Sequence, residues 1–186
     1  MMKKALSILL LLLSVTAILT SCNRRKREIA RLVKNWQHKE ILFPDNLEAK
    51  IFGRDTVCPE LFKKKYKILN YIDTTGCTAC QTKFYEWQLR KREADSLRLD
   101  AAFLFIATVE FYEELETLQQ INKCKIPIFY DREGKLMQLN RLPIERGFQT
   151  FLLDSANRVV LIGNPATNEK LWKLYLKRMG VHGASL

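Results

Sequence analysis

Two cysteines separated by two residues, Cys77 and Cys80, are the side chains in this 186-residue chain best suited to chemistry. The apolar run 66–72 precedes them and has the length and the β-branched and aromatic character of a buried strand. Residues 81–98 follow without Gly or Pro and predict a helix. The pair is therefore expected where a strand passes into a helix N-terminus. Unpaired N–H groups and the helix dipole stabilise a thiolate there, and the thiolate is the reactive form of cysteine.

A Cys-x-x-Cys pair is also half of many zinc sites. The chain has two histidines, His38 and His182, and no second close Cys/His pair to complete four ligands. The sequence therefore favours a redox dithiol over a structural metal site, and we expect no metal. Two other interpretations stay open. The cysteines are ordinary residues at a helix start, or they carry a soft ion such as Cu(I), for which no third ligand is visible.

Three stretches of the chain carry a family resemblance. They are the strand with Cys77-Thr-Ala-Cys80, then Ile126-Pro-Ile-Phe-Tyr-Asp131, then Thr150-Phe-Leu-Leu-Asp154 followed by Val159-Val-Leu-Ile-Gly163. In this order and spacing they resemble thioredoxin-like domains of the TlpA/ResA type, the membrane-tethered thiol–disulfide proteins of bacterial envelopes. The resemblance covers residues 60–180. It implies an α/β, thioredoxin-like fold with a central mixed β-sheet flanked by helices and an N-terminal strand extension.

The same resemblance implies a membrane-anchored thiol–disulfide oxidoreductase that exchanges disulfides with a protein partner. Cys77 is expected to attack the partner's disulfide, and Cys80 to resolve the mixed disulfide, so that the pair itself takes the place of a cofactor. The TlpA likeness favours reduction, with a membrane electron donor of the DsbD or CcdA kind upstream. Asp73, at the end of the predicted strand, would either relay a proton or only cap the turn.

One position departs from the family pattern. Relatives carry a cis-proline just before the strand equivalent to 150–154, facing the dithiol, where it helps to hold the partner's chain. Phe148 stands there, or Gln149 if the register slips by one. A cis bond before a non-proline residue costs about 2.5–4 kcal/mol, so we expect a trans peptide and a remodelled groove. The lost proline supports the alternative function, a non-catalytic binding or scaffold lipoprotein with a structural Cys77–Cys80 pair.

The beginning of the chain resembles a bacterial lipoprotein signal. A basic start at 1–4 and an apolar stretch at 5–19, short for a membrane span, end in Leu-Thr-Ser before Cys22. Cleavage before Cys22 would leave it as the lipidated N-terminus. An uncleaved anchor or a plain secretory signal is the alternative. All these interpretations place the domain outside the cytoplasm, where disulfides persist. Asn23 favours the outer membrane, with the domain facing the periplasm.

The formal net charge of +11 does not point to nucleic acid, because an exported protein rarely meets it. The basic run 23–27 is expected to lie against anionic headgroups, with about 1 kcal/mol per basic residue, or to be a solvated linker. An apolar stripe at helical spacing follows it. We therefore divide the chain into a signal peptide (1–21), a basic tether and amphipathic segment (22–40), a thioredoxin-like domain (41–180) and a tail (181–186).

The rest of the chain alternates strands and helices, which predicts a sheet with right-handed crossovers. In the helix after the cysteines, the expected inward residues are Phe84, Trp87, Ala94 and Leu97. The other expected elements are strands at 40–43, 49–52, 101–108, 126–130, 150–153 and 158–162, helices at 110–122 and 136–142, and a last helix between Asn168 and Gly180.

The two remaining cysteines, Cys58 and Cys124, both lie near the beginnings of predicted strands. A second disulfide between them and a pair of buried thiols are equally supported by the sequence. Neither cysteine opens an obvious helix, so neither is expected to be the nucleophile.

Overall fold

The computed structural model describes residues 24–73 and 82–181, and the structural statements below concern these residues. By its contacts the chain divides into two units, Met1–Trp36 and Gln37–Leu186. Within the described part of the chain, no helix has both the length and the apolar character needed to cross a membrane.

In the first unit, residues 24–36 form a helix, which agrees with the predicted apolar stripe. Arg24 Nε donates a hydrogen bond of 3.0 Å to Glu28 Oε1, an ion pair one helical turn apart on an exposed surface. The predicted signal peptide and the lipidation site at Cys22 fall outside the described residues.

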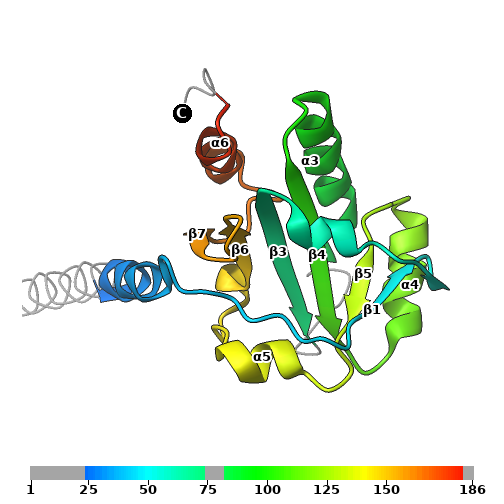
Figure 1. Ribbon diagram of the computed structural model, residues 1–186. Coiled ribbons are helices and arrows are strands. Elements are labelled where there is room, and N and C mark those ends of the chain that lie inside the picture. Colours follow the sequence, from blue (N-terminus) through cyan, green and yellow to red (C-terminus); the bar gives the residue numbers. More distant parts are fainter. Residues whose placement is uncertain (1–23, 74–81, 182–186) are drawn as a thin grey trace, which may run out of the picture. The chain divides into compact units, whose positions relative to one another are not determined.

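The second unit is an α/β structure built on one seven-stranded sheet (Figure 1). Its elements, in chain order, are β1 (Glu48–Ile51), β2 (Arg54–Asp55), η1 (Pro59–Lys63), β3 (Tyr66–Asp73), α3 (Phe84–Ser96), β4 (Ala101–Thr108), α4 (Tyr112–Ile121), β5 (Ile128–Tyr130), α5 (Lys135–Asn140), η2 (Arg146–Phe148), β6 (Thr150–Leu153), β7 (Val159–Ile162) and α6 (Glu169–Arg178). The strand order across the sheet is β2-β1-β5-β4-β3-β6-β7.

The sheet is mixed, as predicted. Strands β3, β4 and β5 run parallel, and β6 and β7 continue the sheet antiparallel on the far side of β3. The β1–β2 hairpin pairs with β5 and forms the N-terminal extension. β3 ends at Asp73, β4 ends at Thr108, and β6 begins at Thr150, which pairs with Asn70. These three strand ends therefore lie on one side of the sheet, which we call the carboxyl edge.

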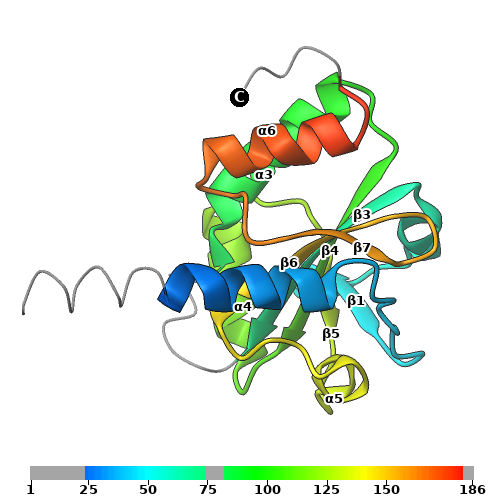
Figure 2. The same ribbon diagram turned by 90° about the vertical axis from the view of Figure 1, so that its left-hand side faces the viewer.

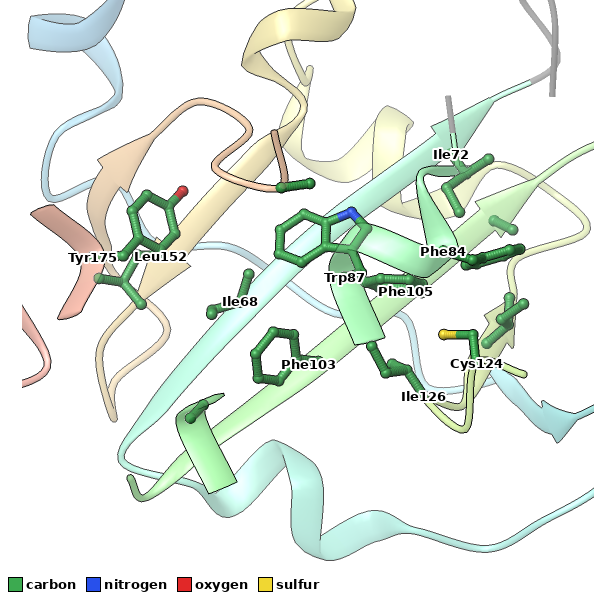
Figure 3. Close-up of a cluster of buried hydrophobic side chains, with 14 of the residues drawn as sticks. Ile68, Ile72, Phe84, Trp87, Phe103, Phe105, Cys124, Ile126, Leu152 and Tyr175 are labelled. Carbon is green, nitrogen blue, oxygen red and sulfur yellow. The ribbon is translucent and has the colours of Figure 1, made fainter. Parts of the chain in front are cut away.

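Helices α3, α4 and α6 cover one face of the sheet, and their buried side chains form one hydrophobic cluster with it (Figure 3). Side chains in a strand alternate between faces, so every second strand residue enters this cluster. Aromatic pairs within it join α3 to β4, Phe84 with Phe105 and Trp87 with Phe103 and Phe105, and α4 to β5, Tyr112 with Tyr130. The predicted inward residues Phe84, Trp87 and Ala94 are all buried.

The intervening strand residues face the other way, where they meet η1, α5 and the segment that precedes β1. Phe129 contacts Phe62 edge-on, and Phe62 contacts Phe43 in the same manner. Figure 2 shows α5 on the opposite side of the sheet from α3 and α4. Both faces are thus covered, as the continuous apolar runs in the parallel strands predicted.

The last helix is held beside α3 by polar contacts at its N-terminal half (Figure 2). Asn168 Oδ1 accepts a hydrogen bond from Leu171 N over 3.1 Å, which confirms the predicted cap. Arg90 donates to Glu169 over 2.8 Å, and Trp172 Nε1 donates to a carboxylate of α3 over 2.7 Å.

Two predictions about this part of the fold are wrong. Residues 40–43 do not form a strand, apart from an isolated bridge between Glu40 and Arg158. The backbone N–H and C=O of Leu42 are instead satisfied by the side chain of Asn140, at 2.8 Å each. Leu97 is 42% exposed, because α3 ends one residue before it.

Candidate functional site

The candidate site lies where β3 leads towards α3, at the carboxyl edge. Cys77 and Cys80 occupy the chain between these two elements, and both fall outside the described residues. The flanking elements agree with the prediction, since β3 is buried over most of its length and α3 packs on the core. The described residues around the strand end therefore define the surroundings in which the two cysteines must act.

The start of the helix differs from the prediction. Thr82 is helical, but Lys83 has the left-handed conformation, with φ of 45° and ψ of 38°, so the predicted helix is interrupted at Lys83 and the regular helix α3 begins at Phe84. A lysine in the left-handed region of φ and ψ is uncommon, and no feature of the local sequence predicts this conformation. The unpaired N–H groups of the first turn of α3 therefore follow Lys83, and they do not follow directly on Cys80. Stabilisation of a Cys77 thiolate by the dipole of α3 stays a prediction.

Asp73 is held at the end of β3 by a buried amide. Gln149 Nε2 donates to Asp73 Oδ2 over 3.1 Å and to the carbonyl oxygen of Pro143 over 3.2 Å. The backbone carbonyl of Gln149 accepts from Tyr71 N over 3.0 Å. Gln149 is buried, so this amide joins the loop before β6 to the last residue of β3. The sequence singled out both Asp73 and Gln149, but it did not predict a contact between them.

The two residues predicted for the cis-proline position have different surroundings. Gln149 immediately precedes β6 and faces the end of β3, whereas Phe148 ends the short helix η2 and is half-buried. The peptide bonds of both residues are trans, as are all others in the described ranges. Of the two, Gln149 is the one whose side chain hydrogen-bonds Asp73, and its correspondence to the proline of the relatives stays a prediction.

A polar pocket of about 270 Å³ opens beside this contact. Within it, Thr150 Oγ1 donates to Asn70 Oδ1 over 2.8 Å, which fixes the orientation of that buried amide. The lining residues come from β3, the start of α3, the loop before β6 and the loop after β7. They are Asn70, Tyr71, Lys83, Arg146, Gly147, Gln149, Asn164 and Thr167. No residue in the sequence signalled this pocket, because its walls come from four separate segments.

Cys58 and Cys124 are both free, so the structure contradicts the possible disulfide between them. Cys124 is fully buried in the hydrophobic cluster beneath α3 and α4 (Figure 3). Cys58 lies next to η1 and lines a second hollow, of about 570 Å³, together with Phe62 and Phe129. Phe129 points to the face of β5 opposite its neighbours in the cluster, so the sheet separates the two thiols.

Burial also makes both thiols poor nucleophiles. It raises the pKa of Cys124 to about 11, and it raises the pKa of Cys58, with a further contribution from the carboxylate of Glu60. In the described part of the chain, no three His, Cys, Asp or Glu side chains converge on a point where a metal ion would bind.

No protein-family model and no curated protein matches the sequence. Solved structures do match. StoA from Bacillus subtilis superposes with a TM-score of 0.50 at 22% identity, over 68% of this chain and 94% of StoA. The thioredoxin domain of a thiol-disulfide oxidoreductase from Bacteroides vulgatus gives a TM-score of 0.53 at 15% identity, over 75% and 97% of the two chains.

The fold is thioredoxin-like. It is shared more widely, because peroxidoxin BcpB from Mycobacterium tuberculosis superposes with a TM-score of 0.56 at 13% identity, over 78% of this chain and 99% of that protein. The thioredoxin-like sheet therefore supports the predicted architecture. These similarities establish the fold, and they do not specify the reaction of this chain.

Proposed function

We propose that this protein is a membrane-anchored thiol–disulfide oxidoreductase of the bacterial envelope that acts through Cys77 and Cys80. The observation that carries the proposal is the position of the pair in the chain. In the sequence it connects the buried central strand β3 to helix α3 of a thioredoxin-like sheet, and Tyr71 of β3 and Lys83 at the start of α3 both line a polar pocket. The other two thiols of the domain are hindered by burial and by a raised pKa, which leaves this pair as the reactive one.

In the proposed reaction the Cys77 thiolate attacks one sulfur of a partner disulfide. The partner's S–S bond breaks, a mixed disulfide forms, and the leaving thiolate takes up a proton. The Cys80 thiolate then attacks the Cys77 sulfur, releases the second partner thiol, and closes a Cys77–Cys80 disulfide. The partner gains two electrons and this chain loses them. A membrane dithiol donor of the DsbD or CcdA kind would return the electrons by the same exchange.

The decisive experiment replaces one cysteine at a time in the full chain. Cys77→Ser should abolish reduction of the insulin disulfides, and Cys80→Ser should accumulate mixed disulfides visible on non-reducing gels. Cys58→Ser is the matched control, because that thiol is partly buried next to η1, beside Phe62 and Phe129, and its pKa is raised. If all three variants reduce insulin like the wild type, the pair is structural and the protein is a tethered binding or scaffold protein.

We also propose that lipid on Cys22 anchors the protein, with the outer membrane as the favoured location and the domain in the periplasm. The basic residues that follow Cys22 would then lie near anionic headgroups. Cys22→Ala should move the protein from the membrane fraction to the soluble fraction, while Cys58→Ala should not. Persistent sedimentation of Cys22→Ala with membranes would rule out a lipid anchor at this position.

Peroxide reduction is a second candidate, favoured by the fold that the chain shares with peroxidoxin BcpB. Here the Cys77 thiolate would attack a peroxide oxygen, release water or an alcohol, and become a sulfenic acid. Cys80 would condense with it, lose water and form the same disulfide. Consumption of hydrogen peroxide by the reduced protein, measured against Cys77→Ser, separates this reaction from disulfide exchange.

A further inference from the structure

The pocket at the carboxyl edge presents cations and hydrogen-bond donors, and its composition indicates what lies against it during the reaction. Its two charged lining residues are Lys83 and Arg146, and the described lining residues include no carboxylate. Lys83 is half-buried at the start of α3, and Arg146 is exposed on η2. The two positive charges therefore come from two separate segments of the chain, the start of α3 and η2.

The neutral lining residues are oriented in the same sense. Asn70 Oδ1 already accepts the Thr150 hydroxyl, so the amide N–H groups are the part of Asn70 that can donate into the pocket. Asn164 Oδ1 accepts from Ala166 N over 2.9 Å, which leaves its amide nitrogen for an incoming group as well. Donors and cations bind acceptor oxygens, and carboxylates most strongly, because charge-assisted hydrogen bonds are the stronger ones.

We infer that the pocket holds a carboxylate next to the disulfide on which this protein acts, so that its substrates are disulfides flanked by acidic residues. The inference rests on the proposed thiol–disulfide activity and specifies its substrate class. The carboxylate of Asp73 is not among the described lining residues, and its Oδ2 accepts a hydrogen bond from Gln149, so its negative charge weakens the attraction without occupying the pocket. The formal net charge of +11, of which Lys3 and Lys4 belong to the predicted signal peptide, adds a long-range attraction for acidic partners.

The test uses three synthetic peptides with the same intramolecular disulfide, flanked by aspartate, asparagine or lysine. The pre-reduced full chain is mixed with each peptide, the reaction is stopped by acid, and free thiols are alkylated and counted by mass spectrometry. Exposed charge pairs are weak, so we expect the aspartate peptide to react roughly fivefold faster than the asparagine peptide. The lysine peptide should be the slowest. The differences should shrink in 1 M salt, where the Debye length is about 3 Å.

Variants locate the effect. Arg146→Glu should abolish or reverse the order of the three peptides, and Lys83→Gln should weaken it. The matched control is Arg98→Glu, the same change of charge at an exposed arginine beyond the other end of α3, roughly 20 Å from Lys83 at 1.5 Å per residue. Arg98→Glu should keep the preference for aspartate.

The outcomes distinguish a failure of the carboxylate-binding pocket from a failure of the oxidoreductase activity. Equal rates for all three peptides, or a preference for lysine, would overturn the acidic pocket and leave the oxidoreductase in place. No reaction with any peptide would overturn the oxidoreductase itself. Oxidised glutathione, a small disulfide that carries carboxylates, distinguishes the source. A faster reaction than with the aspartate peptide would assign the pocket to a small anionic disulfide, and a slower one to an acidic polypeptide.

Discussion

A single added oxygen at Gln149 should make the stability of the domain depend on pH. In the wild type, the Gln149 amide donates to Asp73 Oδ2 over 3.1 Å inside a buried contact. Gln149→Glu keeps the size and shape of the side chain and replaces the donor by a second carboxylate. The introduced carboxylate and that of Asp73 then face each other where the wild type has a hydrogen bond of 3.1 Å, and the side chain at position 149 is buried.

The size of the effect follows from Coulomb's law. Two unit charges about 4 Å apart at an effective dielectric constant of about 20 repel by roughly 4 kcal/mol. A neighbouring carboxylate raises the pKa of the introduced carboxyl above the unfolded value of about 4.3. A group whose pKa is raised on folding contributes stability that is present below the unfolded pKa and lost as the pH rises through the folded pKa. The variant should therefore approach the wild type near pH 4.5 and fall about 3 kcal/mol below it at pH 7.5.

The assay is urea unfolding of the full chain at the two pH values, followed by the fluorescence of Trp87 and Trp172, which are both fully buried. Gln149→Leu removes the hydrogen bonds without adding charge, and its loss of stability should not depend on pH. Adding Asp73→Asn to Gln149→Glu exchanges donor and acceptor and should restore most of the stability at pH 7.5. If Gln149→Glu and Gln149→Leu behave alike at both pH values, the two side chains do not meet as described.

Three further predictions concern the domain around the site. Lys67 is fully buried in β3, and this burial lowers the pKa of its ammonium group, while the carboxylate of Asp154 acts in the opposite direction. The lysine therefore holds its proton more tightly in the unfolded chain than in the folded one. The stability of the wild type should therefore rise relative to that of Lys67→Met as the pH approaches 10.5. At neutral pH, Lys67→Met should be as stable as the wild type or up to about 2 kcal/mol more stable in urea unfolding. Gly53 has φ of +77°, and an added Cβ would lie 2.5 Å from Glu116 Oε2, so Gly53→Ala should cost about 1–2 kcal/mol in the same assay. Cys124, with its pKa raised to about 11, should resist iodoacetamide at pH 8 until urea unfolds the chain, whereas the half-buried Cys58 should be alkylated before Cys124 in a peptide map.

The sequence predicted those parts of the fold whose signals are local. The buried strands β3 and β4, the hairpin of β6 and β7 and the cap at Asn168 each follow from a short run of residues. The strand predicted at residues 40–43 was wrong. These residues are as hydrophobic as a strand, but the N–H and C=O of Leu42 hydrogen-bond the side chain of Asn140 and not a neighbouring strand. A partner so distant in the chain leaves no mark on the local pattern.

The candidate site shows the same division. Asp73 and Gln149 were each singled out, but their contact depends on the register between β3 and β6, which pairs Asn70 with Thr150. The left-handed start of α3 at Lys83 was invisible, because lysine has no preference for that conformation. The pairing of Cys58 with Cys124 was undecidable from spacing, and only the arrangement of the sheet separates the two thiols.

The carboxyl edge explains why recognition and reactivity can vary separately in this protein. β3 and β4 end there and β6 begins there, so loops that are far apart in the sequence converge on one side of the sheet. The proposed reactive pair belongs to the connection after β3, whereas Arg146 belongs to the loop before β6. Gln149 connects the two through Asp73, and its buried position ties that loop to the strand end. A substitution at the exposed Arg146 can therefore change which disulfide the protein prefers. The hydrogen bond between Gln149 and Asp73, which holds the end of β3 against the loop before β6, is retained in such a variant.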